Sequence, residues 1–168
     1  MVNLRKIEIK DAAEFIALNQ ALAKETKLMM RKPDECMTEV SVAEKIIESA
    51  LANDNFLYLA EEDNELVGFI SASKEMLNRI KHRAYIVIGI RKSYQGQGIG
   101  NRFFEELDRW AAEHGLRRLE LTVMTHNLAG KALYEKHGFV VEGIKKDSMC
   151  VDGEYVDEYY MGKIYEKK

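Results

Sequence analysis

Glycine residues alternate along one short stretch of the chain, and their spacing suggests a site for an anionic ligand. The stretch reads Gln95-Gly96-Gln97-Gly98-Ile99-Gly100; it follows the apolar run Ala84–Ile90 and leads into a helical pattern that starts at Ile99. Because glycine has no Cβ, successive backbone N–H groups can turn toward one point. The first N–H groups of a helix also lack acceptors within that helix. The sequence therefore predicts a loop that holds a phosphate or pyrophosphate group.

Other interpretations of this loop fit less well. A turn that only reverses the chain does not need three alternating glycines between a strand and a helix. A P-loop requires Gly-Lys followed by Ser or Thr, whereas Gly100 is followed by Asn101 and Arg102. A dinucleotide-binding loop has the spacing Gly-x-Gly-x-x-Gly in the first βαβ unit, whereas this loop alternates and lies in mid-chain. These differences disfavour a nucleotide-dependent kinase or dehydrogenase.

The same residues resemble the acetyl-CoA signature of the GNAT family of N-acetyltransferases, Gln/Arg-x-x-Gly-x-Gly/Ala. A second stretch, Asn127 followed by Ala132–Phe139, is similar to another segment of that family. Glu142-Gly143 and Asp152–Glu158 resemble the tails of its bacterial small-molecule and peptide N-terminal acetyltransferases. The resemblance covers the chain from about Tyr85 to the end.

This resemblance implies a cosubstrate, acetyl-CoA, and a role for each matching residue. The backbone of the strand before the loop would pair with the pantetheine arm, and the loop backbone would hold the pyrophosphate. Asn127 would contact the cofactor arm, and Tyr134 would protonate the departing CoA thiolate. The implied cofactor-binding residues are Ile88, Ile90, Gln95, Gly96, Gln97, Gly98, Ile99, Gly100, Asn101 and Asn127.

Single residues in these positions also have structural interpretations. Tyr134 could place its ring in the core with its hydroxyl on a backbone carbonyl. Asn127 could cap a helix, which is compatible with a cofactor contact. Glu75, at the end of a predicted strand, is a candidate general base for the acceptor amine, with a solvated strand-end charge as the alternative. Tyr134 and Glu75 are therefore the two candidate catalytic residues, each with a structural alternative.

Charged and metal-ligating residues add two expectations. Four basic residues flank the proposed anion site, and any of them could meet the 3′-phosphate of CoA: Arg91, Lys92, Arg102 and Lys131. The histidines show no His-x-x-x-His spacing and no pairing with cysteine, so no metal site is expected.

The elements that must position these residues follow from hydrophobic spacing and turn signals. A strand around Leu4–Ile9 precedes two helices, with capping patterns at Asp11/Glu14 and at Ser41/Glu44. The later elements are strands at 56–60, 66–72 and 84–90, a helix at 99–115, a strand at 119–124, a helix at 127–137, and strands at 139–144 and 155–165. The order βααβββαβαββ indicates an α+β (mixed α/β) fold, and the resemblance implies a GNAT-like fold with a mostly antiparallel mixed sheet flanked by helices.

Between the first two helices lies an irregular segment, Thr26–Thr38, which contains Met29 and Met30. Its methionines could fill a gap in the core or contact an apolar part of a ligand. We expect the segment to border the acceptor site.

Composition bounds the remaining possibilities. The 168 residues, 46% hydrophobic and 32% charged, suit a single domain over residues 1–168. A net charge of -3 with scattered basic residues disfavours nucleic-acid binding, and no apolar run is long enough to span a membrane. Two cysteines and no leader pattern suggest a cytoplasmic protein. The tyrosine-rich last strand could offer an edge to a second copy, which suggests a homodimer.

The function expected from these observations is transfer of an acetyl group from acetyl-CoA to a primary amine of a small molecule or of a protein or peptide N-terminus. The alternative is a non-catalytic module that binds acyl-CoA and regulates a partner protein.

Overall fold

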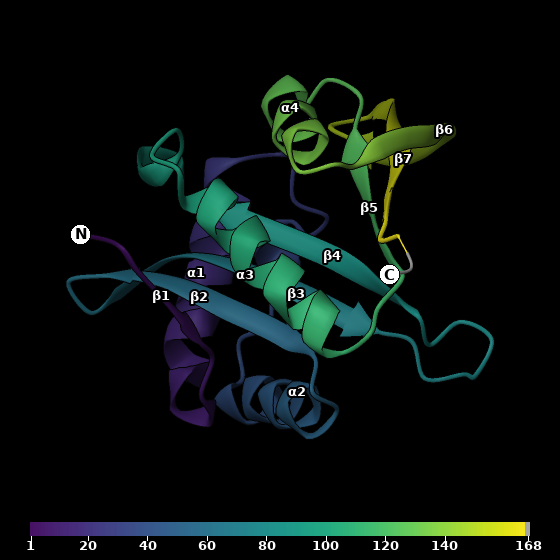
Figure 1. Cartoon of the computed structure of the whole chain (residues 1–168). Coiled ribbons are helices and arrows are strands. Elements are labelled where there is room, and N and C mark those ends of the chain that lie inside the picture. Colours follow the sequence, from purple (N-terminus) through teal and green to yellow (C-terminus); the bar gives the residue numbers. More distant parts are fainter. Residues whose placement is uncertain (167–168) are drawn as a thin grey trace. The chain divides into compact units, whose positions relative to one another are not determined.

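A computed structural model describes residues 1–166, and its elements follow the predicted order (Figure 1). They are β1 (Asn3–Lys6), α1 (Ala12–Glu25), α2 (Val40–Ala52), β2 (Phe56–Glu62), β3 (Glu65–Lys74), β4 (Arg83–Ile90), α3 (Ile99–Glu113), β5 (Arg118–Met124), α4 (Leu128–Lys136), β6 (Val140–Val151) and β7 (Glu154–Ile164). Short 3-10 turns lie at Ile9–Asp11, Pro33–Glu35 and Lys92–Tyr94. The predicted order βααβββαβαββ is confirmed.

The strands form a seven-stranded mixed sheet in the order β1-β2-β3-β4-β5-β7-β6. β4 and β5 pair in parallel, whereas β1 with β2, β2 with β3, β5 with β7 and β6 with β7 pair antiparallel. The last strand, β7, therefore lies between β5 and β6 and has no free edge. The expectation that this tyrosine-rich strand offers an edge to a second copy is wrong, because the outer position belongs to β6.

Packing divides the chain into two compact units. The first comprises Met1–Ser73 and Val87–Leu107; the second comprises Lys74–Ile86 and the chain from Asp108 onward. The boundary falls inside β4 and inside α3, so each of these elements contributes to both units. The expectation of a single domain over residues 1–168 stays a prediction.

The core of the first unit lies between the helices α1 and α2 and one face of the neighbouring strands. Leu57 and Leu59 alternate along β2 and face the helices, together with Phe69 of β3, which is the register partner of Leu59. The rings of Phe15 in α1 and Phe69 meet edge to face with centroids 5.4 Å apart. Apolar residues recur at every second position in the strands and at helical spacing in α1 and α2. These two spacings explain why the segments form the elements that the sequence predicts.

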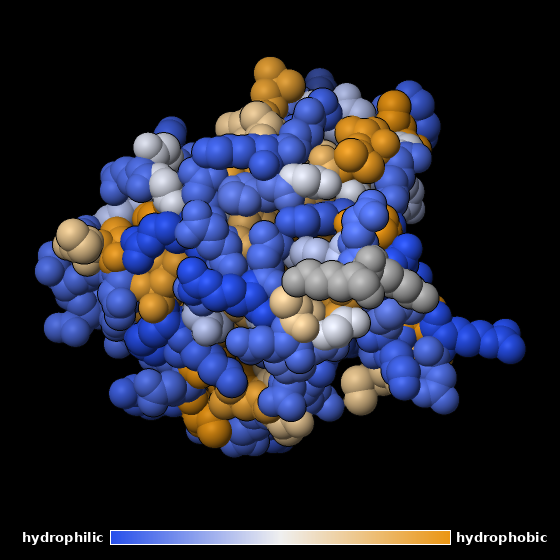
Figure 2. All heavy atoms as spheres, viewed as in Figure 1, coloured by the Kyte–Doolittle hydropathy of each residue, from blue (hydrophilic) through white to orange (hydrophobic). Residues whose placement is uncertain are grey.

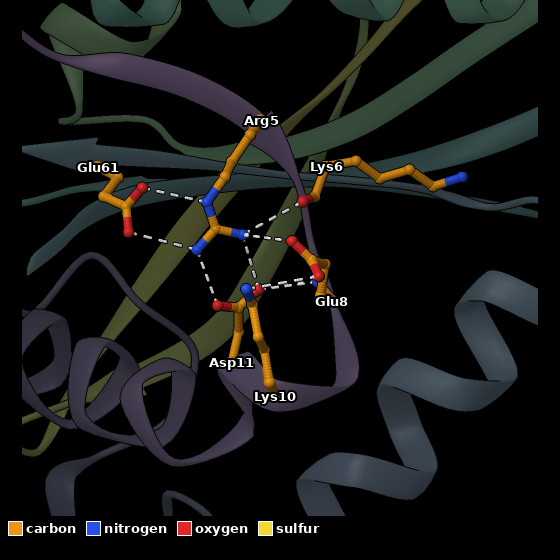
Figure 3. A network of polar contacts seen from close by, with 6 residues as sticks. All are labelled: Arg5, Lys6, Glu8, Lys10, Asp11 and Glu61. Atoms are coloured by element: carbon orange, nitrogen blue, oxygen red, sulfur yellow. Dashed lines mark hydrogen bonds and ion pairs between the residues drawn. The ribbon is translucent and has the colours of Figure 1, made fainter. Parts of the chain in front are cut away.

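A partly buried ionic cluster connects β1 to the start of α1 (Figure 3). The Arg5 guanidinium donates to both oxygens of Asp11 at 2.8 Å, and its Nε donates to Glu61 Oε2 at 3.1 Å. Asp11, which is 4% exposed, also accepts a hydrogen bond from the Glu8 amide at 2.8 Å. The helix begins directly after Asp11, but its carboxylate makes no capping hydrogen bond to α1. The predicted helix start is nearly correct, whereas the predicted capping role of Asp11 is wrong because Arg5 occupies the carboxylate.

We expect Asp11→Asn to lower the free energy of unfolding near pH 7 by about 2 kcal/mol, because charge-assisted hydrogen bonds to Arg5 are lost. Arg5 lowers the pKa of Asp11 below its ordinary value of 3.8. A carboxylate with a lowered folded-state pKa stabilises the fold above the unfolded pKa, and this contribution is lost as the pH falls through the folded pKa.

Urea unfolding at several pH values tests this expectation. The difference between Asp11→Asn and wild type should be full near neutral pH and should shrink as the pH falls below about 4. Glu14→Gln, a change at an exposed residue of the same helix, is the control. A difference that stays constant with pH would contradict the account.

The second unit is built on β5, β7 and β6, with α4 packed against one side. Lys131 of α4 lies over the ring of Tyr159 in β7, 5.4 Å from its centroid, and Tyr134 meets Phe139 at 6.2 Å. The β6–β7 turn is Asp152-Gly153, with φ of 52° and 84°, a residue pair that suits a tight hairpin turn. β6 extends past the predicted end at Ile144 because the ladder resumes after a bulge between Lys145 and Met149.

The surface is mainly hydrophilic on the face shown in Figure 2, where apolar residues form small separate patches. Within residues 1–166, no helix combines the length and the apolar character that crossing a membrane requires.

Candidate functional site

The predicted glycine loop leads from β4 to the first turn of α3 in the first unit. A 3-10 turn at Lys92–Tyr94 precedes it, and Gly96 and Gly98 have φ of 75° and 82°. These values lie in the left-handed region that side-chain-bearing residues rarely adopt. The Arg102 amide donates to Gly98 O at 3.1 Å and so begins the helical ladder of α3. The amides before it, from Ile99 to Asn101, are in the N-terminal positions that a helix does not satisfy internally.

Two glutamine side chains brace this loop from within. Gln95 Nε2 donates to Ile90 O at 3.1 Å, and Gln97 Nε2 donates to Ser93 O at 3.1 Å. Both amide side chains thus bond to the backbone that precedes the loop. This arrangement leaves the glycine-rich main chain as the surface suited to an anion.

β4 runs close to α1 just before the loop, because Gly89 has no side chain. A Cβ built at Gly89 would lie 2.7 Å from Leu22 Cδ1 and 3.1 Å from Phe69 Cε1. The sequence gives no signal for this close approach, since Gly89 reads as one more residue of an apolar strand.

Asn127 and Tyr134 lie at the start and in the body of α4, in the second unit. Asn127 Oδ1 accepts a hydrogen bond from the Gly130 amide at 3.0 Å, which confirms the helix cap. The contact of Asn127 with the cofactor arm stays a prediction.

Tyr134 is 8% exposed, and its environment strongly affects its ionisation. Burial, with a smaller contribution from the nearby Tyr85, raises the pKa of Tyr134 to about 12. The hydroxyl therefore keeps its proton throughout the neutral range, as a proton or hydrogen-bond donor must. The catalytic role of Tyr134 stays a prediction.

Glu75 directly follows β3 and is half-buried, with its amide donating to Arg83 O at 3.2 Å. In the part of the chain that the structure describes, no group is bonded to its carboxylate. Glu75 belongs to the same unit as Tyr134. Its role as general base stays a prediction.

The four basic residues that the sequence suggests for the 3′-phosphate differ in the contacts that they already make. Arg91 is ion-paired with Glu25 and Glu65, Lys131 is 2.6 Å from Glu135, and Arg102 Nη1 donates to Val2 O at 2.9 Å. Lys92 is exposed and makes no ion pair with any residue from 1 to 166. Arg102 is exposed as well, so Lys92 differs from the other three in its lack of such a partner.

Two polar contacts of the second unit were not predictable from the sequence. The Tyr85 hydroxyl and Thr122 Oγ1 are 2.8 Å apart on neighbouring strands, and Glu158, 7% exposed, accepts a short hydrogen bond from Ser148. To predict that Tyr85 lies beside Thr122, one would need the register of β4 and β5, in which Tyr85 pairs with Glu120. Among residues 1–166, no three His, Cys, Asp or Glu side chains are grouped as a metal would need.

Comparison with known proteins agrees with the resemblance. Residues 19–139 match the family model described as the acetyltransferase (GNAT) family. The match covers more than half of the sequence, and the chain belongs to the GNAT family. The mixed α/β fold and the family resemblance inferred from the sequence are both confirmed.

Individual relatives show how far the likeness extends. The L-amino acid N-acetyltransferase AaaT of Escherichia coli (strain K12) is 30% identical over 106 residues, 61% of this chain and 64% of that protein. The match thus spans less than two thirds of that relative. A GNAT-family acetyltransferase from Streptococcus pneumoniae is 31% identical, with a TM-score of 0.93, over 99% of this chain and 100% of that chain.

A third comparison bears on the fold alone. The yncA protein of Salmonella typhimurium, solved with its cofactor acetyl-CoA, is 15% identical and has a TM-score of 0.87. That likeness covers 99% of this chain and 95% of the other.

Proposed function

We propose that the protein transfers an acetyl group from acetyl-CoA to a primary amine of a small molecule or of a peptide N-terminus. The observation that carries the proposal is the family signature at Gln95–Gly100, folded as a loop with two left-handed glycines at the start of α3. The E. coli relative named for L-amino acids supports a small amine as the acceptor.

The backbone performs the binding in this proposal. The main chain from Gln95 to Asn101 holds the pyrophosphate through the amides that follow Gln95, since the Gln95 amide itself donates to Lys92 O. The main chain of Ile88 and Ile90 pairs with the pantetheine arm. Asn127 contacts the same arm from the start of α4. Fixed donors of this kind hold the thioester beside the amine, and proximity then contributes much of the rate.

Proton transfer completes the reaction. The amine nitrogen attacks the thioester carbonyl carbon after its proton has passed to a base, for which Glu75 is the candidate. The carbon–sulfur bond breaks, and the Tyr134 hydroxyl is the proposed partner of the departing sulfur. The amide product and the CoA thiol together contain every atom of the two substrates, and the thiol gains the proton that the amine has lost.

The raised pKa of Tyr134 refines its role. A thiol has a pKa of about 8.5, so complete proton transfer from a phenol of pKa about 12 would be uphill by about 5 kcal/mol. A hydrogen bond from the hydroxyl to the developing thiolate avoids that cost. Tyr134 therefore acts chiefly as a hydrogen-bond donor to the departing sulfur.

Binding measurements separate this proposal from its rivals. Isothermal titration should show binding of CoA and acetyl-CoA, with no binding of ATP or NAD at matched concentrations. Binding of ATP or NAD instead would favour a nucleotide-dependent enzyme. A non-catalytic acyl-CoA module would bind acetyl-CoA and release no thiol with any amine; Tyr134 and Asn127, both matching the family pattern, favour the enzyme.

Free Cys36 and Cys150 support a reducing, cytoplasmic setting.

The irregular segment before α2 leads to a prediction about the acceptor. Met29 packs against the core, whereas Met30 is 76% exposed. Met30→Ala should raise the acceptor KM about 5-fold, as expected for one lost apolar contact, and leave CoA affinity unchanged. Met29→Ala is the comparison, since its main effect should be on stability. A change in CoA affinity in Met30→Ala would place the segment at the cofactor instead.

A further inference from the structure

The last residue of α1, Glu25, holds the chain where it enters the glycine loop. One carboxylate oxygen, Oε1, accepts from Arg91 Nε at 2.8 Å and lies 2.7 Å from Arg91 Nη2. The other oxygen, Oε2, accepts from the backbone amide of Lys92 at 3.0 Å. A single side chain thus fixes both the guanidinium of one residue and the main chain of the next.

These contacts differ from an ordinary surface ion pair. The side chains of Glu25 and Arg91 are 24% and 30% exposed. The hydrogen bond from the Lys92 amide lowers the pKa of Glu25 most, and the hydrogen bond from Arg91 lowers it further. The carboxylate is therefore charged at neutral pH. A backbone amide as partner gives the contact a fixed geometry that two flexible side chains alone would lack.

The junction held by Glu25 is hydrogen-bonded along its main chain as far as the loop. The Arg91 amide donates to Val67 O at 2.9 Å, which fixes the chain to β3. The 3-10 turn then continues with Tyr94 N to Arg91 O at 2.9 Å and Gln95 N to Lys92 O at 3.3 Å. The direction in which the main chain enters the loop at Gln95 therefore depends on where residues 91 and 92 are held.

Charge explains why the arrangement suits an anion site. A free carboxylate near the loop would repel a pyrophosphate, but Arg91 neutralises Glu25. Arg91 is in turn engaged by Glu25 and, through Nη1 at 3.3 Å, by Glu65. Both residues thus shape the approach to the loop, and their charges are already compensated.

We propose that Glu25 is a positioning residue for the pyrophosphate loop: it sets the geometry of Gln95–Asn101 through Arg91 and Lys92 and makes no contact with the cofactor itself. This inference rests on the proposed function, in which the loop binds the pyrophosphate of acetyl-CoA. It also gives the end of α1, which leads into the 26–38 segment, a direct connection to the cofactor loop.

The test compares Glu25→Gln with Glu65→Gln by calorimetry with CoA. Glu25→Gln removes the charge and places an amide N–H against other donors, so Kd for CoA should rise on the order of 10-fold. Glu65, which is 68% exposed and makes one 3.3 Å contact to the same guanidinium, is the matched control and should change Kd less than about 2-fold.

A second measurement distinguishes positioning from a general loss of structure. S-acetylpantetheine carries the thioester and the pantetheine arm and lacks the pyrophosphate. With this substrate, kcat/KM of Glu25→Gln should equal that of wild type, whereas KM for acetyl-CoA should rise at unchanged kcat.

Three results would overturn the inference while leaving the proposed function in place: wild-type CoA affinity in Glu25→Gln, an equal loss in Glu65→Gln, or an equal loss of activity with S-acetylpantetheine. A wild-type protein that does not bind CoA would instead refute the proposed function.

Discussion

Tyr134→Phe should lower kcat about 100-fold while leaving acetyl-CoA affinity close to that of wild type, as expected for the loss of one hydrogen bond to a developing anion. The substitution removes one hydroxyl and keeps the ring that packs against Phe139. Because the hydroxyl acts on the departing sulfur, its loss should appear in kcat rather than in cofactor binding.

The pH profile gives this prediction a further signature. The Tyr134 hydroxyl must be protonated, and its pKa is raised to about 12. It therefore causes no fall in kcat up to about pH 10; a fall from this group begins only as the pH rises toward about 12. The raised pKa of Tyr134 also contributes to stability of the fold below about pH 10, and this contribution is lost as the pH rises through about 12. Activity is therefore measured below about pH 10, where unfolding does not affect kcat.

Tyr165→Phe is the matched control for Tyr134→Phe. Tyr165 lies in the same unit, is hydrogen-bonded to Asp108, and has a pKa raised by burial and by that carboxylate. Its substitution should cost stability and leave kcat unchanged. If Tyr134→Phe turned over at the wild-type rate with an active amine, Tyr134 would be structural and would make no hydrogen bond that assists the departing sulfur.

Gly98→Val should weaken CoA binding about 30-fold, since a β-branched residue in the left-handed region costs about 2 kcal/mol or shifts the loop. Gly98 has φ of 82°, and a Cβ at this position would meet nothing within 4 Å. The expected effect therefore comes from backbone geometry and not from a steric clash. Calorimetry with CoA measures it.

Gly153→Val provides the control, because Gly153 has φ of 84° and equally open surroundings in the β6–β7 turn. It should suffer similar backbone strain and keep wild-type CoA affinity. Equal CoA affinity in Gly98→Val and wild type would exclude the loop as the pyrophosphate site.

Local patterns predicted much of this fold because they report local backbone geometry. The strands predicted at 56–60 and 66–72 form β2 and β3, and the turn between them, Asp63-Asn64 with φ of 50° and 64°, consists of residues that tolerate left-handed conformations. The helix of the glycine loop begins at Ile99, as its spacing indicates. These features depend on neighbours within a few residues.

Features that depend on distant partners could not be predicted in the same way. Asp11 looks like a helix cap until Arg5 is placed beside it, and β7 looks like an edge strand until β6 pairs with it. Glu25 lies 67 residues from its partner Lys92. Such pairs are set by strand order and helix packing, which spacing along one sequence does not encode.

Acetyl transfer itself is the most direct test of the account. The protein is incubated with acetyl-CoA and a panel of amino acids, polyamines, antibiotic amines and peptides with free N-termini; free thiol and the mass of each amine are then followed. The account predicts that at least one amine gains one acetyl group with release of an equal amount of CoA thiol, and that Tyr134→Phe slows both together. Tight binding of acetyl-CoA with no acetylated product from any amine class would contradict it and would leave a binding module in its place.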